Sequence, residues 1–502
     1  MKDNPSQDVE KISDEEKKED NQGGEHKRLA GYRPLETIIR LCPGPLVSQI
    51  VSTLYGVVDS MWVSKFIGEI GMTALSIAFV IDASAISFGI AVSVSAATQI
   101  AYLLSMKEYD KINQVAADLF RVCLIIGCCI PAILLPIAKP IFRFLEAPPE
   151  VIKLSFQYVI PLCAMNFFAC CYYTMCGILQ AEGRTWTYAI SQISSMLLNM
   201  VCWDPLLLWS LKRIVGSSMA TEIAMLIPGV ILISLMFCGK FAAKPKLGLF
   251  CNKFAKETWM ALKTGLSALI MNISFVVPTF VMQKYLAIRA NKTGEFEMVI
   301  AVYNAIFRIY GLAFFVPLAM NAAYLPAASY AFGAKMKKRI LHLTWHVIWI
   351  SIVWGFLITF VTSVFPGPIS SIFSKDPNFR KWSLRMVPIC FYTYSFSCVK
   401  FIMISFLQAT QQVTKAMILS VVTELLGLPI FGSIFHFFAE QNSPKTLLYA
   451  YIVNDIVAAS ICLATASPSF YRFIKEPDGQ NDVITEEKSG DEDDSVRIAD
   501  SL

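Results

Sequence analysis

The first long apolar stretch of the chain, residues 36–63, carries a carboxylate, Asp59. A carboxylate at bilayer depth costs about 2.5–3.5 kcal/mol or more, so it requires a partner, water or a role. Helical steps back from Asp59 reach Gly56, Tyr55 and Ser52, a small or polar face that we expect to point away from lipid. Protonation would remove the charge and change the hydrogen bonds of the helix, as proton coupling requires. The structural alternative is an aspartate that bonds to a neighbour and never titrates.

A second polar stripe follows in the span predicted at 187–211. Gln192, Ser195 and Asn199 share one face of this helix, and Asp204 follows Asn199 by five residues. Five residues on an ideal helix rotate a side chain by ~140° from its partner. Asp204 therefore leaves the stripe on a regular helix, and it could instead cap the helix end.

Further charged residues lie within other predicted spans: Asp82, Lys284, Arg308, Lys400, Glu424 and Asp455. Lys284 and Arg308 stand near span ends, where long side chains extend to the membrane interface. Lys400 and Glu424 could pair with each other in the second half of the chain.

Asp82 opens a helical face of small residues. Ala85, Gly89, Ser93 and Ala96 follow it at helical spacing. Such a face either surrounds a polar site or lets two helices pack closely. The sequence leaves both interpretations open.

No pattern in the sequence indicates a metal site, a cofactor or an enzyme. His342 and His346 have the spacing of ligands on one helix face, but no Glu or Cys nearby completes a set. The nucleotide-binding loop Gly-x4-Gly-Lys-Ser/Thr of ATP-driven pumps is absent from the sequence. We expect neither catalysis nor a bound cofactor.

The composition requires a membrane to surround these residues. Apolar residues make up 55% of the chain and charged residues 16%, with a mean hydropathy of +0.54, whereas soluble domains carry about 25% charged residues. The hydropathy pattern predicts about twelve transmembrane helices. Their approximate bounds are 36–63, 72–103, 115–138, 151–180, 187–211, 218–238, 257–286, 298–332, 340–365, 383–409, 415–438 and 446–470.

Polar tails flank this membrane core. Residues 1–34 and 475–502 carry net charges of about −2 and −7, which leaves about +14 on the remainder of a chain whose net charge is +5. We expect disordered tails and a basic core whose flanking Lys and Arg contact anionic membrane lipids, not nucleic acid. The predicted organisation is an N-tail (1–34), a first lobe (35–238), an inter-lobe loop (239–256), a second lobe (257–474) and an acidic C-tail (475–502).

An internal repeat relates the two lobes. The tripeptide Leu-Gln-Ala occurs at 179–181 and again at 407–409, an offset of 228 residues. Lys107 and Lys335 share that offset. Six spans per copy give parallel repeats, which form two bundles about an axis along the membrane normal, with the substrate path between them. The predicted fold class is an all-α membrane protein of about twelve helices in two six-helix bundles.

The even number of spans places both tails on one side of the membrane. Lysines of the loop 239–256 and of the segment 335–339 favour a cytoplasmic location for that side. The glycosylation sequence Asn291-Lys292-Thr293 lies in a loop on the other face. We expect cytoplasmic tails, in either the plasma membrane or an internal, vacuolar-type membrane.

Several motifs resemble the multidrug and toxic compound extrusion (MATE) family. The segment 54–64 (LYGVVDSMWVS) is similar to its first-helix signature, and 179–183 (LQAEG) to its loop between spans four and five. Asn199 with Asp204 resembles its fifth-span motif, and 330–335 (YAFGAK) its turn after span eight.

This resemblance implies a secondary antiporter with two lobes around a V-shaped cavity. Such proteins export amphipathic, often cationic organic compounds in exchange for H⁺ or Na⁺. It also implies a coupling-ion site formed by Asp59, Asn199 and Asp204, with Tyr55 one turn away. Arg308 matches a family position in span eight.

The chain departs from the family pattern in two places. Family members have four residues from Asn to Asp, and here the spacing is five; a π-bulge adds one residue to a turn and would realign Asn199 with Asp204. Some branches carry a Glu in span seven, where this chain is apolar around Phe275. The second departure favours coupling in the first lobe.

Two other functions remain open from the sequence. A lipid-linked oligosaccharide flippase of the same superfamily would use basic residues in its cavity, for which Lys284, Arg308 and Lys400 are candidates. A transport-inactive receptor is the other alternative.

Overall fold

The computed structural model describes residues 24–144, 147–274, 277–293, 296–438 and 443–475, except for the side chains of 53, 57, 69, 292, 293, 296 and 297. The first 23 residues and the tail 476–502, predicted to be disordered, lie outside this part of the chain. So do Phe275 and, in the predicted glycosylation sequence, the side chains of Lys292 and Thr293.

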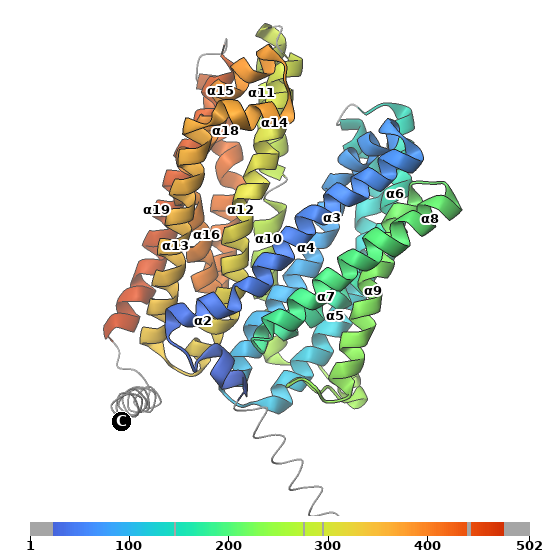
Figure 1. Ribbon diagram of the computed structural model, residues 1–502. Coiled ribbons are helices and arrows are strands. Elements are labelled where there is room, and N and C mark those ends of the chain that lie inside the picture. The colour runs from blue at the N-terminus through green and yellow to red at the C-terminus, as the bar shows by residue number, and fades with distance from the viewer. Residues whose placement is uncertain (1–23, 145–146, 275–276, 294–295, 439–442, 476–502) are drawn as a thin grey trace, which may run out of the picture.

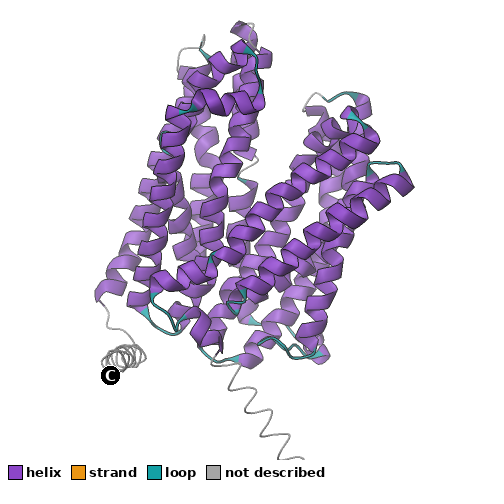
Figure 2. Cartoon of the chain, viewed as in Figure 1, coloured by secondary structure: helices purple, strands orange, loops and turns teal. Residues whose placement is uncertain are grey.

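The described chain folds into helices and connecting loops, with no strand (Figure 2). Eleven of its helices are long and apolar enough to cross a membrane. The fifth predicted span, 187–211, is not among these eleven, because it consists of three consecutive helical segments, α7, η1 and α8, of which η1 is a π-helix.

The elements form two bundles that converge at the end where the described chain begins and ends, and diverge toward the opposite end (Figure 1). The first contains α2 (Pro34–Leu41), α3 (Pro43–Ile67), α4 (Glu69–Ser105), α5 (Tyr109–Phe144), α6 (Pro149–Ala181), α7 (Thr185–Leu197), η1 (Leu198–Trp203), α8 (Asp204–Leu211) and α9 (Val215–Phe237). The loop after α9 holds the short η2 (Leu247–Cys251). The second contains α10 (Lys256–Ile273), α11 (Val277–Thr293), α12 (Phe296–Gly333), α13 (Lys337–Val364), α14 (Pro366–Phe373), α15 (Pro377–Phe391), α16 (Tyr394–Ala409), α17 (Val413–Leu419), the π-helix η3 (Ser420–Leu426), α18 (Gly427–Phe438), η4 (Pro444–Leu448) and α19 (Tyr449–Lys475).

The helix ends confirm the internal repeat. The helices α5 and α13, α6 and α15, and α7 and α17 each start 228 residues apart. The same offset relates the left-handed residues that end helices: Lys107 (φ 57°) to Lys335 (φ 61°), and Gly183 (φ 67°) to Gln411 (φ 57°). A left-handed residue at this position lets the next amides bond back to the last helical carbonyls. Both lobes therefore turn at equivalent points.

Small residues allow the bundles to touch along α4. This helix packs against α10 and α12 of the second bundle. A side chain at Gly265 of α10 would collide with Ser95 and the carbonyl of Ala91, and one at Gly333 of α12 with Ser105. The lack of a side chain at these glycines permits close helix packing.

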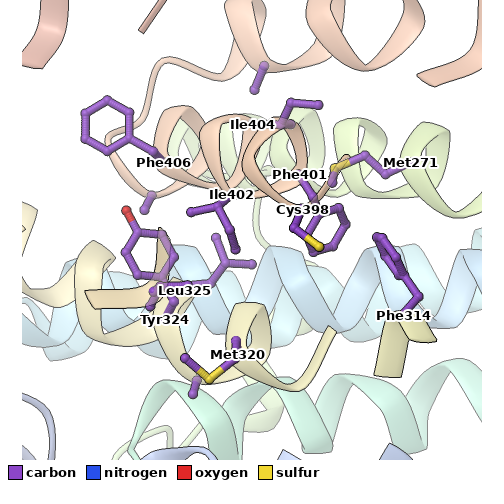
Figure 3. Packing of buried hydrophobic residues seen from close by; sticks show 14 of the residues in the cluster. Met271, Phe314, Met320, Tyr324, Leu325, Cys398, Phe401, Ile402, Ile404 and Phe406 are labelled. Carbon is purple, nitrogen blue, oxygen red and sulfur yellow. The ribbon is translucent and has the colours of Figure 1, made fainter. Parts of the chain in front are cut away.

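Large apolar side chains fill the interior of the second bundle (Figure 3). Phe314 of α12 meets Phe401 of α16 edge to face, with ring centroids 5.0 Å apart. Met271 of α10 and Cys398 lie in the same cluster. This packing holds α16 between its neighbours and thereby positions Lys400, the charged residue on this helix.

The N-terminal segment corrects one prediction. Residues 24–29 are helical rather than disordered, and Leu29 is fully buried. Arg28 Nε donates to the carbonyl of Glu182 in the first bundle at 2.8 Å. Arg339 of α13 donates to the carbonyl of Leu29 at 3.1 Å. We call residues 24–41 the tail-side strap, because they bond to both bundles. Its first helix, residues 24–29, is too short and too charged for hydropathy to reveal it.

Candidate functional site

Asp59 occupies the middle of α3 and faces α9. Only 5% of its surface is exposed, and its carboxylate accepts a short hydrogen bond from the hydroxyl of Ser217. One turn earlier on α3, the buried hydroxyl of Tyr55 approaches Thr221 of α9 without forming a hydrogen bond of ordinary geometry. Two residues of α9 thus face the polar side of α3.

The π-helix η1 places Asn199 and Asp204 on one face. The backbone N–H of Asp204 donates to the carbonyl of Asn199, five residues earlier, where an α-helix would bond four residues back. The wider turn also leaves the carbonyl of Met200 available to accept the indole N–H of Trp62 at 3.1 Å. The π-bulge that would realign Asn199 with Asp204 is therefore present.

Three polar side chains converge between α3 and η1. Asp204 is fully buried and lies against both Asp59 and Asn199. Neither of its carboxylate oxygens accepts a hydrogen bond within the described residues. Two adjacent carboxylates with little hydration repel each other and resist carrying two charges. The arrangement can hold a shared proton or another small cation.

A second acidic group lies deeper in the first bundle. Asp82 of α4 and Glu222 of α9 line one small cavity, whose volume of about 20 Å³ for water centres suffices for one water molecule. Glu222 is only 3% exposed, and its Oε2 accepts no hydrogen bond from the described residues. Sequence reasoning missed Glu222, although an acid inside the predicted span 218–238 was the available signal.

The small residues beyond Asp82 form a packing surface. A side chain at Gly89 would collide with Tyr173 of α6, and one at Gly177 of α6 would collide with the carbonyl of Ser93. The close-packing interpretation of this face therefore holds, while Asp82 itself lines the cavity at the end of the face.

The second bundle contains a charged triad. Lys400 of α16 is 5% exposed and forms an ion pair with Glu424 of η3, with Nζ 3.1 Å from Oε2. Asp455 of α19 accepts a hydrogen bond from Thr393 at 3.1 Å and lies within electrostatic range of Lys400. The expected pairing of Lys400 with Glu424 is present. A cavity with about 70 Å³ for water centres adjoins all three charges.

Lys284 and Arg308 lie apart from these groups. Both side chains are exposed. The Lys284 ammonium stands 5.2 Å from the ring centroid of Phe144. Both observations agree with long side chains that extend toward polar surroundings.

One buried arginine was not anticipated from the sequence. Arg289 of α11 is 1% exposed and donates to the carbonyl of Phe435 at 2.6 Å and to the hydroxyl of Thr446 at 2.7 Å. It satisfies carbonyl groups at the end of α18, which indicates a structural role. Among the described residues, no three His, Cys, Asp or Glu side chains converge as metal ligands would.

Comparison with known proteins decides the family. The family model MatE matches residues 46–203 and 292–431, more than half of the chain. The chain belongs to the MATE family.

Curated relatives of this MATE transporter include multidrug export proteins named MepA. The MepA of Staphylococcus haemolyticus is 24% identical over 421 residues, which cover 83% of this chain and 90% of that protein. The MepA of Staphylococcus aureus strain MSSA476 is 21% identical over 388 residues, covering 77% and 84%.

Solved structures share the fold of this MATE chain. A MOP superfamily transporter from Pyrococcus furiosus, described as having a binding pocket of reverse polarity, aligns with a TM-score of 0.79 at 20% identity, covering 90% of this chain and 99% of that one. A MATE protein in complex with MaL6 aligns with a TM-score of 0.78 at 21% identity over the same shares. A multidrug resistance MATE transporter in an outward-facing conformation aligns with a TM-score of 0.77 at 20% identity, covering 89% and 98%. The fold class predicted from the sequence, an all-helical membrane protein of two parallel-repeat bundles, is confirmed.

Proposed function

We propose that this transporter is a secondary antiporter that exports amphipathic, often cationic organic compounds in exchange for H⁺ or Na⁺. Asp59, Asn199 and Asp204 bind the coupling ion, and Tyr55 contributes one helical turn away. The space between the lobes takes the substrate. The MepA relatives, which are multidrug export proteins, support an organic substrate.

One observation carries the proposal. Asp204 is fully buried beside Asp59, and neither of its oxygens accepts a hydrogen bond within the described residues. A purely structural aspartate at this depth would accept hydrogen bonds of ordinary geometry, because an unpartnered carboxylate in an apolar environment is costly. A proton or a small cation removes that cost, and its departure restores it. The site therefore responds to the ion that drives transport.

The same chemistry explains how the ion could drive a conformational change. Asp59 lies on α3, Asp204 follows η1, and Ser217 lies on α9. Loss of the ion leaves two repelling carboxylates between these elements, whereas binding lets them approach. A site whose charge state changes the packing of three helices can bias two conformations of the protein. Asn199 can orient whichever carboxyl group carries the proton.

The flippase alternative requires a basic cavity for a diphosphate group. Of its three candidate residues, Lys400 is already paired with Glu424. The acids of the first bundle outnumber the remaining bases, Lys284 and Arg308. The electrostatics thus favour a cationic substrate over a lipid-linked diphosphate.

Transport in proteoliposomes tests the proposal. Wild-type protein should export a fluorescent organic cation when an inward pH or Na⁺ gradient is imposed to drive it. Asp59→Asn keeps the size of the side chain but removes its ionisation, so gradient-driven transport should fall by at least tenfold. Ser218→Ala is the matched control, because the Ser218 hydroxyl bonds only to the carbonyl of Val215 in its own helix.

Two outcomes would overturn the proposal. Equal gradient-driven transport by wild type and Asp59→Asn would remove Asp59 from the coupling step. Movement of a lipid-linked sugar, with no cation transported, would assign the protein to the flippases.

A further inference from the structure

Two pairs of acids lie in the interior of the first bundle. Asp59 and Asp204 form the pair described above, and Asp82 and Glu222 line a separate cavity between α4, α6 and α9. We propose that Asp82 and Glu222, with one water molecule, form a second proton-binding site of the transporter. This inference rests on the proposed function and deepens it: two protons, one from each pair, enter for each monovalent cation exported.

The cavity borders several polar side chains. Asp82, Glu222, Asn166 and Thr221 are among the residues that line it, beside a larger number of apolar residues. Its volume of about 20 Å³ for water centres fits one water molecule, which needs two to four polar partners.

Glu222 supplies the second, independent observation. Its side chain is 97% buried, since only 3% of its surface is exposed, and it lines the cavity. Its Oε2 accepts no hydrogen bond from the described residues. A buried acceptor without a donor destabilises the folded protein. A proton on that oxygen lets it donate a hydrogen bond to the water or to Asp82.

Among the described residues, no basic group is found close enough to perturb these two acids. The titratable groups close to Glu222 are Asp82 of α4 and three residues of α6, namely Cys163, Cys170 and Tyr173. On α3, Tyr55 and Asp59 face the same region: Glu222 lies within electrostatic range of Tyr55, and Asp82 within range of Asp59. Every one of these groups is neutral or negative, so bound protons must balance the charge.

Geometry connects the two acidic pairs. Thr221, the neighbour of Glu222, lines the cavity and approaches the Tyr55 hydroxyl, one turn from Asp59. Because Asp82 lies within electrostatic range of Asp59, loss of the proton at one pair makes loss at the other harder.

Charge movement distinguishes one site from two. Exchange of one proton for one monovalent cation is electroneutral, whereas exchange of two protons moves one net positive charge inward. An inside-negative membrane potential at equal pH should therefore drive a monovalent cation out of vesicles that contain the wild-type protein. The probe is ethidium, and the potential is set with potassium and valinomycin.

Substitution of the second pair should remove this response alone. In Glu222→Gln, potential-driven export at equal pH should fall by at least tenfold, while export driven by a pH difference should persist. Asp82→Asn should behave in the same way, and Ser218→Ala should retain both responses. Glu222→Asp keeps a titratable group and should restore part of the response to potential.

The results separate failure of this inference from failure of the proposed function. Potential-driven export that persists in both Glu222→Gln and Asp82→Asn overturns the second site. Export by the wild-type protein that does not change with the membrane potential overturns it as well. If both substitutions also abolish export driven by a pH difference while Glu222→Asp does not rescue it, the residues are structural and the inference is wrong. Asp59→Asn that retains export under both driving forces overturns the proposed coupling site instead.

Discussion

Lys400 is a buried base placed between two acids. Its ammonium pairs with Glu424 at 3.1 Å, and Asp455 lies within electrostatic range on α19. With both acids ionised, the triad carries one net negative charge. The three residues therefore contribute unequally to stability, because loss of the single positive charge exposes two negative ones.

This asymmetry gives a prediction. Lys400→Met should destabilise the protein by about 3 kcal/mol or more, because removal of one partner of a buried ion pair leaves an uncompensated charge. Glu424→Gln should cost less, since Asp455 still compensates Lys400. Thermal unfolding in detergent, followed by tryptophan fluorescence, would measure both effects.

Lys263, an exposed lysine of α10, provides the control for these measurements. Lys263→Met removes the same charge from the surface and should change the unfolding temperature little. A larger loss of stability in Glu424→Gln than in Lys400→Met would contradict the assignment of Lys400 as the common partner of both acids.

Candidate site residues could be predicted from the sequence only where a polar or charged residue interrupts an apolar span. Asp59 and Lys400 stood out because charge is rare in apolar spans. Glu222 gave the same signal, but its position near the start of a predicted span suggested nothing about the cavity it shares with Asp82. A cavity depends on helices that are distant in sequence, and one sequence without a structure does not reveal which faces meet.

Two π-helices occupy matching places in the two lobes. Leu198–Trp203 follows α7, and Ser420–Leu426 follows α17. The sequence suggested the first, because a five-residue spacing places Asn199 and Asp204 on different faces of a regular helix. No comparable spacing indicated the second. It carries Glu424, so both widened turns present acids toward the interior of their lobes.

The tail-side strap links the lobes through a titratable contact. Burial is the main cause that raises the pKa of Glu25 from its usual 4.5 to about 7, with Glu182 adding to the rise and Arg28 opposing it. The strap is therefore most stable on the protein when Glu25 is protonated. This contribution is fully present below pH 4.5 and is lost as the pH rises through about 7.

Hydrogen exchange along the strap, residues 24–41, tests this pH dependence. Backbone amides of the strap should be more protected at pH 6 than at pH 8, after correction for intrinsic exchange rates. Glu25→Gln should make the protection nearly equal at the two pH values, because the titrating group is gone. Burial also raises the pKa of Glu182, so a pH dependence that persists unchanged in Glu25→Gln would assign the effect to that residue.

At the scale of the whole molecule, the repeat preserves helix ends but not charge. The starts of matching helices and their left-handed end residues keep the 228-residue offset, so the sequence predicted two bundles of equal construction. The acids diverged: the first lobe has Asp59, Asp82, Asp204 and Glu222 without a buried base nearby, and the second pairs Lys400 with its acids. Helix positions follow hydropathy, whereas side-chain partners depend on contacts between distant segments.

This division supports the proposal that the coupling ion binds in the first lobe. If ion binding changes the affinity for the substrate, thermodynamic linkage requires that the substrate change the affinity for the ion by the same factor. The lobes touch along α4, the helix that carries Asp82. A change of charge in the first lobe can therefore be transmitted to the interface between the lobes.

Equilibrium binding of a fluorescent organic cation to the purified transporter, measured across pH and Na⁺ concentration, tests this claim most directly. For the wild type, affinity should fall at least tenfold as the proton or Na⁺ activity rises through the range where the first lobe loads. Asp59→Asn should bind the cation with an affinity nearly independent of both. A wild type indifferent to both ions, or an Asp59→Asn variant with the same dependence as the wild type, would contradict coupling through the first lobe.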